Sequence, residues 1–293
     1  MRLIQKLQEL KNNSTNSDFI PFFRISIGLI LVMHFISILG DFKLLYGLNS
    51  IIPSDIHTLY VSEYIILFDE IILLLNNLTS SELVSVFVFK IIYILLCVLI
   101  ILGFYSRFSS ILLLILQVSL IKSSYYYSYG VDFFSSMSLL YIMLLPSDDY
   151  FSLKQYLFKL KRKSNYNFVL KTFQIHLSIA YFVSGLEKLS GYNWRNGESV
   201  WKALHLPNFS NDFSLDFNYL GKFPEFILLI GWLTILIELL YPVFINLKKT
   251  RLIWLYLTIL LHLGIALTLN LYFFSAIMIT WNITNFYFIK TDN

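Results

Sequence analysis

The sequence has 293 residues, of which 57% are hydrophobic, 18% aromatic and only 14% charged, and its mean hydropathy is +0.68. Soluble globular proteins carry about 25% charged residues, so this composition excludes an ordinary soluble domain, a disordered chain and a collagen. The net charge of +4 is too small to indicate a nucleic-acid partner. We therefore expect an integral membrane protein.

The N-terminal segment 1–18 is mostly polar and is followed by the first apolar run without a small-residue cleavage site. This order predicts a cytoplasmic segment and a retained membrane span rather than a signal peptide. The single cysteine, Cys97, lies inside an apolar run, so we expect neither an internal disulfide nor a paired-thiol redox motif.

Apolar runs of membrane length recur along the chain, since a membrane helix needs about 20 apolar residues. Two of the runs are short, and the last two are separated only around Asn270, which predicts a tight hairpin. The segment 57–77 carries three acidic residues and reads as an amphipathic helix on the membrane surface. The eight expected spans are residues 19–39, 82–104, 108–121, 132–146, 166–187, 225–245, 252–270 and 271–288.

The positions of the basic residues support this topology, because Lys and Arg in short loops are retained on the cytoplasmic side. With both termini cytoplasmic, the inside segments hold more than half of the 22 basic residues. These are Arg2, Lys6, Lys11, Arg107, Lys154, Lys159, Lys161, Arg162, Lys163, Lys248, Lys249, Arg251 and Lys290. The outside segments hold Lys43, Lys122, Arg195, Lys202 and Lys222. We therefore expect a multi-pass protein of the cell membrane.

The predicted organisation is one all-α membrane domain over residues 19–288, a bundle of about eight helices. Its outside loops are 40–81 and 188–224, its basic inside loop is 147–165, and 289–293 is a cytoplasmic tail. Long loops with aromatic content are often folded and functional. The alternative is that 188–224 only seals the bundle at the interface, where Trp and Tyr concentrate.

Ionisable residues inside the spans are costly unless they are paired or hydrated, so each one is a functional hypothesis. The predicted topology places Lys188 near the outer end of its span, His262 near the middle, and Arg24, His176 and Glu238 in the inner half. The remaining ionisable residues, all expected near outer span ends, are His34, Lys90, Asp132 and Glu187.

Structural roles explain several of these residues equally well. Arg24 can extend to the lipid headgroups or pair with Glu238, and neither arrangement involves chemistry. His176 is 11 positions before Glu187, which puts both on one helix face but roughly 16 Å apart along the axis. They therefore predict a stripe facing the bundle and not a shared metal site. His262 is interpreted either as a ligand contact or as a hydrogen bond between helices.

Lys188 closes a span that reads YFVSGLEKLSGYNW, directly beneath the aromatic loop 188–224. A lysine in a dry recess is more easily deprotonated and can act as a base. The alternative is a lysine that caps the C-terminus of a helix, where the dipole favours a cation. Phosphate-binding glycine loops, HExxH, GxSxG and Cys/His metal spacing are all missing from the sequence, and no metal site is predicted.

Several stretches, in order, resemble the horizontally transferred transmembrane (HTTM) domain, the membrane domain of vitamin K-dependent gamma-carboxylase and of short bacterial relatives. They are FFRISIGLILVMHF, LLYGLNSIIP, YFVSGLEKLSGYNWRNGESVWKAL, LTILIELLYP and HLGIALTLNLYFFSAIM. The resemblance covers about residues 19–288, and the element GLEKLSGYNWRNG is its most specific part.

The resemblance implies that Lys188 corresponds to the carboxylase lysine that deprotonates vitamin K hydroquinone, at a site that opens to the lumenal side. It implies a reduced vitamin K or similar quinol as cofactor and a secreted peptide or peptide-toxin precursor as partner. Within that reading, His262, Trp194 and the loop 189–223 would shape the cofactor pocket, and Arg24, Glu238 and His176 would be structural polar groups.

Two departures from the carboxylase keep the function open. The sequence ends at Asn293, where the carboxylase continues into the lumenal domain that engages its substrate, and KSSYYYSYGVDFFSS lacks a match for its histidine in that region. Short relatives include the sporulation-delaying protein B-like family, associated with maturing a secreted peptide toxin. The alternative function is therefore a non-enzymatic membrane protein for maturation, export or immunity of such a toxin.

Overall fold

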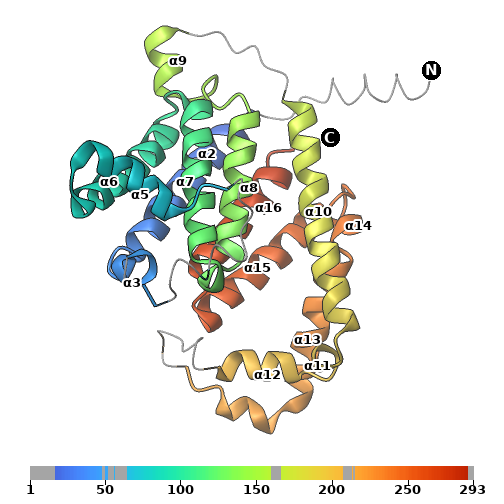
Figure 1. The fold of residues 1–293 in the computed structure, drawn as a ribbon. Coiled ribbons are helices and arrows are strands. Elements are labelled where there is room, and N and C mark those ends of the chain that lie inside the picture. The colour runs from blue at the N-terminus through green and yellow to red at the C-terminus, as the bar shows by residue number, and fades with distance from the viewer. Residues whose placement is uncertain are drawn as a thin grey trace. The chain divides into compact units, whose positions relative to one another are not determined.

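The computed structural model describes residues 17–47, 65–159, 166–206 and 215–289, together with residues 50, 51, 56 and 213. Every regular element in these ranges is a helix, which confirms the predicted all-α class (Figure 1). Nearly all of the predicted N-terminal segment, the start of the predicted surface helix at 57–64, and residues 290–293 lie outside the described residues.

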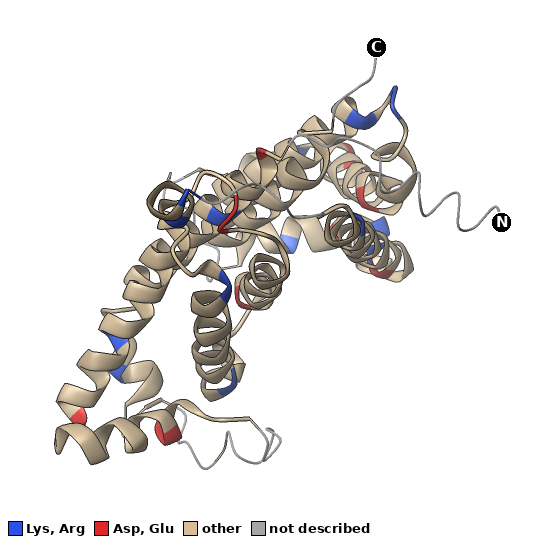
Figure 2. Ribbon diagram, turned by 90° about the horizontal axis from the view of Figure 1, so that it is seen from above, with Lys and Arg blue, Asp and Glu red and all other residues tan. Residues whose placement is uncertain are grey.

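Each of the eight predicted apolar runs forms a helix, because a backbone in lipid must satisfy its hydrogen bonds internally. Charged residues are sparse along these helices, and most of the ribbon in Figure 2 is uncharged. The helices are α2 (Phe19–Ser37), α6 (Glu82–Leu102), α7 (Ser106–Ser123), α8 (Gly130–Leu144), α10 (Asn167–Ser190), α13 (Pro224–Leu239) followed by α14 (Tyr241–Phe244), α15 (Arg251–Leu269) and α16 (Tyr272–Phe286).

Five of the described helices are long and apolar enough to cross a membrane, namely α2, α6, α7, α10 and α15. Helix α8 is apolar but shorter. Helices α13 and α16 have 16 and 15 residues, so each rises only about 24 Å or less, compared with a hydrocarbon core of about 30 Å.

The chain divides into two compact units, one of residues 20–166 and one that includes residues 167–293. We call them the N-terminal and the C-terminal unit. The N-terminal unit contains α2, α6, α7 and α8 with the shorter α3 (Phe42–Tyr46), α5 (Phe68–Thr79), η1 (Tyr125–Tyr127) and α9 (Leu153–Phe158). Helix α7 packs against both α6 and α8.

The core of the N-terminal unit depends on close helix contact and on aromatic stacking. Phe35 of α2 stacks on Tyr93 of α6 with ring centroids 3.9 Å apart. The Tyr93 hydroxyl donates to Oε1 of Gln117 at 2.5 Å, which satisfies a polar side chain that is buried in the middle of α7.

The C-terminal unit is built on α10, which packs against α13, α14 and α16. Between α10 and α13 the predicted outside loop 188–224 contains α11 (Tyr192–Arg195), α12 (Glu198–His205) and η3 (Asn218–Lys222). Helices α15 and α16 form the predicted hairpin (Figure 1). Its turn is at Asn270, which has a φ of 55°, in a left-handed conformation that asparagine tolerates better than most residues.

Candidate functional site

An ion pair near the end of α10 joins it to α13. The Lys188 Nζ atom lies 2.7 Å from Oε2 of Glu238 and donates to Oγ of Ser184 at 2.6 Å. The lysine side chain is 18% exposed and the glutamate side chain 9% exposed. Each charge therefore has a direct partner at a position that is mostly shielded but still reachable from outside the helices.

Small residues on α10 and α13 allow this pair to form. Gly185 lies one turn before Lys188 and is buried against the backbone of Leu239 and Glu238. A side chain at this position would hold the two helices apart. Earlier in α13, Gly231 lies against the backbone carbonyl of Trp194, and Trp232 Nε1 donates to the carbonyl of Arg195 at 3.2 Å.

The pair corrects two predictions. Glu238 is paired with Lys188, and Arg24 donates to backbone carbonyls, so the predicted Arg24–Glu238 pair is wrong. Lys188 and Glu238 were also expected at opposite depths. Because the two side-chain atoms are 2.7 Å apart, they lie at the same depth in the membrane. Glu238 in the inner half and Lys188 at the outer end therefore cannot both be correct.

Trp194, in the predicted outside loop 188–224, lies beside the same ion pair. The Lys188 ammonium is 5.2 Å from the centroid of the indole ring, within the range in which an aromatic face attracts a cation. Helix α11 brings the ring there because Gly191 ends α10 with hydrogen bonds from its amide to the carbonyls of Glu187 and Lys188. Glu187 itself is exposed and takes no part in the pair.

A second polar cluster surrounds His262 in the interior of the same unit. The Tyr181 hydroxyl lies 2.7 Å from His262 Nε2, and Asn282 Nδ2 donates to the Tyr181 oxygen at 2.7 Å. Asn282 Oδ1 accepts from Tyr241 at 2.7 Å and from Thr258 at 3.2 Å. Because Asn282 donates to the tyrosine oxygen, we assign the Tyr181 hydrogen to His262 Nε2, which leaves the proton of the neutral imidazole on Nδ1.

The His262 cluster and the ion pair lie along one face of α10. Tyr181, Ser184 and Lys188 follow at intervals of three and four residues, the spacing of one helix face. Seven residues rise about 10 Å, so the two groups are about two turns apart. His262 is only 3% exposed, and it contributes to the interior of the unit rather than to the surface beside Trp194.

Arg24 anchors a loop within the N-terminal unit. It is 1% exposed, and its guanidinium donates to the carbonyls of Ser147 at 2.6 Å, Tyr150 at 3.4 Å and Phe151 at 2.7 Å. Gly103, with a φ of 71°, leaves room for it, because a Cβ atom there would collide with the guanidinium. These hydrogen-bond partners of Arg24 are thus all backbone carbonyls of this one loop.

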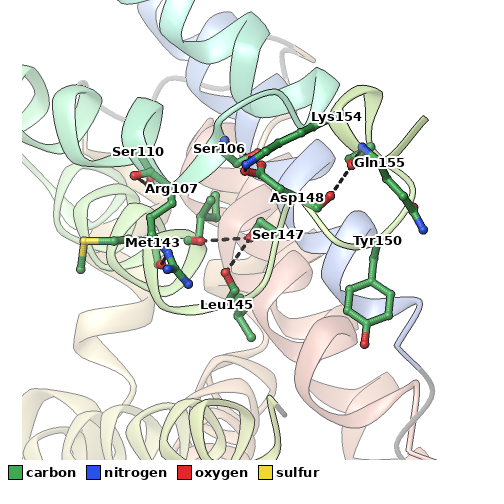
Figure 3. Close-up of polar contacts among 12 residues, drawn as sticks. Ser106, Arg107, Ser110, Met143, Leu145, Ser147, Asp148, Tyr150, Lys154 and Gln155 are labelled. Carbon is green, nitrogen blue, oxygen red and sulfur yellow. Dashed lines mark hydrogen bonds and ion pairs between the residues drawn. The ribbon is translucent and has the colours of Figure 1, made fainter. Parts of the chain in front are cut away.

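The loop that Arg24 holds is organised by Asp148 (Figure 3). Its carboxylate accepts from the amide of Ser106 at 2.8 Å and from Lys154 Nζ at 3.1 Å. Its backbone carbonyl accepts from the Ser152 hydroxyl, which caps α9 by accepting from the amide of Gln155 at 2.9 Å. These contacts fix the conformation of the first part of the predicted basic loop 147–165, of which residues 160–165 lie outside the described residues.

The other predicted intramembrane polar groups have packing partners. His176 lies edge-on to Trp281 at 5.5 Å, and His34 lies edge-on to Tyr129 at 6.4 Å. Lys90 is over the ring of Phe42 at 4.4 Å. Asp132 accepts from the amide of Tyr129 at 3.0 Å and so caps α8. Among the described residues no three His, Cys, Asp or Glu side chains gather into a metal site.

Sequence reasoning missed Ser184, Tyr181 and Asn282. The first two share the face of α10 that carries Lys188, and a polar spacing of three and four residues was the available signal. Asn282 lies in the stretch ITWNITNF of the last predicted span, and an asparagine inside a membrane helix commonly forms hydrogen bonds between helices.

The chain matches no model of a known protein family, no curated protein and no solved structure. The resemblance to the HTTM domain consequently stays a prediction from the residues quoted above.

Proposed function

We propose that this chain is a multi-pass protein of the cell membrane with eight spans and both termini in the cytoplasm. Five long apolar helices support the membrane assignment. The remaining predicted spans are α8, α16 and the segment α13–α14, which bring the total to eight. An even number of spans puts both termini on the same side of the membrane. The basic residues gather in the loops that this topology puts inside.

We further propose that it is an HTTM/gamma-carboxylase-like enzyme that uses a reduced quinone to modify a secreted peptide, with Lys188 as the base. The observation that carries the proposal is the contact between Lys188 Nζ and Glu238 Oε2 at 2.7 Å. A base must release its own proton before it can accept another. In this site Glu238 is placed to take that proton, and Ser184 is placed to orient the amine.

The proton balance is simple. The Lys188 ammonium transfers one proton to the Glu238 carboxylate, which leaves a neutral amine and a neutral carboxylic acid. The neutral amine of Lys188 would then hold a hydroxyl group of a bound quinol and take up a proton at Nζ, and the resulting ammonium ion would offer a positive charge to that oxygen.

The residues present fit a quinol. Lys188 offers a nitrogen to a hydroxyl group, and the Trp194 ring beside it offers an aromatic surface to a flat ring. When bound, a reduced quinone supplies an acidic hydroxyl group whose deprotonated form reacts with oxygen. Helices α11 and α12 follow α10 directly on the expected outer side, where a secreted peptide would approach.

The test is oxygen uptake by the purified full chain in detergent, supplied with a reduced naphthoquinone. We expect uptake by the wild type, loss of uptake in Lys188→Ala, and loss in Lys188→Arg because a guanidinium does not deprotonate at usable pH. Lys202→Ala is the matched control, since Lys202 pairs with Glu198 on the exposed face of α12. Equal uptake by the wild type and Lys188→Ala would contradict the proposal.

The alternative function is a non-enzymatic, sporulation-delaying protein B-like role in maturation, export or immunity of a peptide toxin. One observation favours it: Lys188 Nζ already donates both to Glu238 and to Ser184. A pair of this kind can serve only to join α10 to α13. Under this alternative, a variant in which Lys188 and Glu238 are both replaced by uncharged residues keeps its biological function as long as it folds.

A further inference from the structure

A groove runs along the surface of α10 in the C-terminal unit. Its volume is about 440 Å³. One wall is the stretch of α10 from Lys171 to Phe182, and the other is formed by Pro242 and Asn246, in and directly after α14. None of these residues belongs to the Lys188–Glu238 pair or to the His262 cluster, so the groove is a separate feature of the unit.

The length and lining of the groove match one acyl chain. Ile175, Ile179 and Phe182 lie in one row along α10 and are 60%, 55% and 43% exposed. From Lys171 to Phe182 the helix rises about 16 Å. This is about half of the 30 Å hydrocarbon core of a bilayer, so the groove spans the depth of one leaflet.

The end of the groove at Lys171 carries uncompensated positive charge. Lys171 Nζ donates to Oε1 of Gln174 at 3.0 Å, and Arg251 begins α15 shortly after the groove residue Asn246. Arg251 Nε donates to the carbonyl of Ile245 at 3.4 Å. In the part of the chain that the structure describes, neither cation forms an ion pair with a carboxylate.

Two neighbouring cations without an acidic partner favour an anion between them. Lys248 and Lys249, which are exposed in the segment just before Arg251, add to the positive charge at this end. Basic pockets on the cytoplasmic side of membrane helices bind anionic headgroups, and each nearby Lys or Arg strengthens the attraction. The positive-inside rule predicts that this end faces the cytoplasm.

We propose that this groove binds one anionic phospholipid, with its phosphate between Lys171 and Arg251 and one acyl chain along Ile175, Ile179 and Phe182. The positive charges of Lys171 and Arg251 favour an anionic over a zwitterionic headgroup, because the positive group of a zwitterionic headgroup is repelled by the two cations. The apolar row selects a lipid over a free phosphate ion. The site is independent of the quinol chemistry proposed above.

Lipid titrations of the purified full chain, followed by native mass spectrometry, test this site. The three ligands are phosphatidylglycerol, phosphatidylcholine with the same acyl chains, and inorganic phosphate. We expect the wild type to retain phosphatidylglycerol at least tenfold more tightly than phosphatidylcholine. Lys171→Gln and Arg251→Gln should each weaken phosphatidylglycerol binding about fivefold, and the control Lys202→Gln should leave it unchanged.

The acyl groove is tested by Ile179→Trp, which fills it from α10 and should weaken binding of both phospholipids. Equal binding of the two phospholipids by the wild type would overturn the proposal, and this comparison requires no variant to fold. Displacement of phosphatidylglycerol by inorganic phosphate, together with full binding by Ile179→Trp, would also overturn it by identifying a simple anion site. A failure of the quinol experiments proposed above would leave both of these lipid-binding results unchanged.

Discussion

A Cβ atom on Gly185 would lie 2.5 Å from the backbone nitrogen of Leu239 and 2.9 Å from its Cα atom. Helices α10 and α13 therefore meet backbone against backbone, one turn before Lys188. The obstructing atoms are main-chain atoms that no side-chain rotation can move away. This contact sets the separation at which Glu238 reaches the lysine.

Gly185→Ala should consequently force α13 away from α10 and lower the free energy of unfolding by about 1–3 kcal/mol. The matched control is Gly264→Ala in α15, where a Cβ atom meets nothing within 4 Å. That substitution should raise the stability by up to about 1 kcal/mol, because alanine is the better helix former. Denaturant titrations of the purified protein measure both, and equal effects of the two substitutions would refute the close contact.

The ion pair makes its own prediction. Lys188→Met leaves the Glu238 carboxylate shielded and unpaired, which should cost about 3 kcal/mol of stability. Lys188→Met combined with Glu238→Leu removes both charges and should recover most of that loss, because an apolar pair of similar volume is often as stable as a buried ion pair. If the double variant loses as much unfolding free energy as the two single variants lose together, the two charges do not interact as described.

Asn282 is the centre of the cluster around His262, since it bonds Tyr181, Tyr241 and Thr258. Asn282→Leu should lower the stability by about 2 kcal/mol, because it leaves the buried Tyr241 hydroxyl without its acceptor. Asn193→Ala on the exposed face of α11 is the control and should change stability by less than about 0.5 kcal/mol. A loss in the control as large as in Asn282→Leu would rule out a special role for the cluster.

Arg24→Lys tests the anchor of the N-terminal unit. A lysine lacks the planar fork that reaches the carbonyls of Ser147 and Phe151 together, so we expect a loss of about 2 kcal/mol. We also expect faster proteolysis between α8 and α9. Arg107→Lys is the control, because Arg107 is exposed and bonds one carbonyl, that of Met143. Unchanged proteolysis in Arg24→Lys would show that the loop does not depend on the guanidinium.

The helices could be predicted from the sequence because a membrane leaves the backbone few alternatives. The runs 19–39 and 82–104 differ by at most two residues at either end from Phe19–Ser37 and Glu82–Leu102. Interactions between helices could not be predicted in this way. Lys188 and Glu238 are 50 positions apart, and only the packing of α10 on α13 brings them together.

Arg24 shows a second limit of sequence reasoning. Its partners are backbone carbonyls of a loop more than 120 positions away. Every residue has a carbonyl, so no residue type marks the acceptors. A search for an oppositely charged side chain led to Glu238 instead. Lys188 and Trp194 could be placed together because α11 follows α10 directly along the chain.

The central claim is that Lys188 accepts a proton from a reduced quinone. Anaerobic mixing of the purified protein with a reduced naphthoquinone tests it without oxygen or peptide, since the quinol anion has its own absorption spectrum. We predict that the wild type and Lys202→Ala produce the anion spectrum and that Lys188→Ala and Lys188→Arg do not. The same anion spectrum in Lys188→Ala, or none in the folded wild type, would contradict the account.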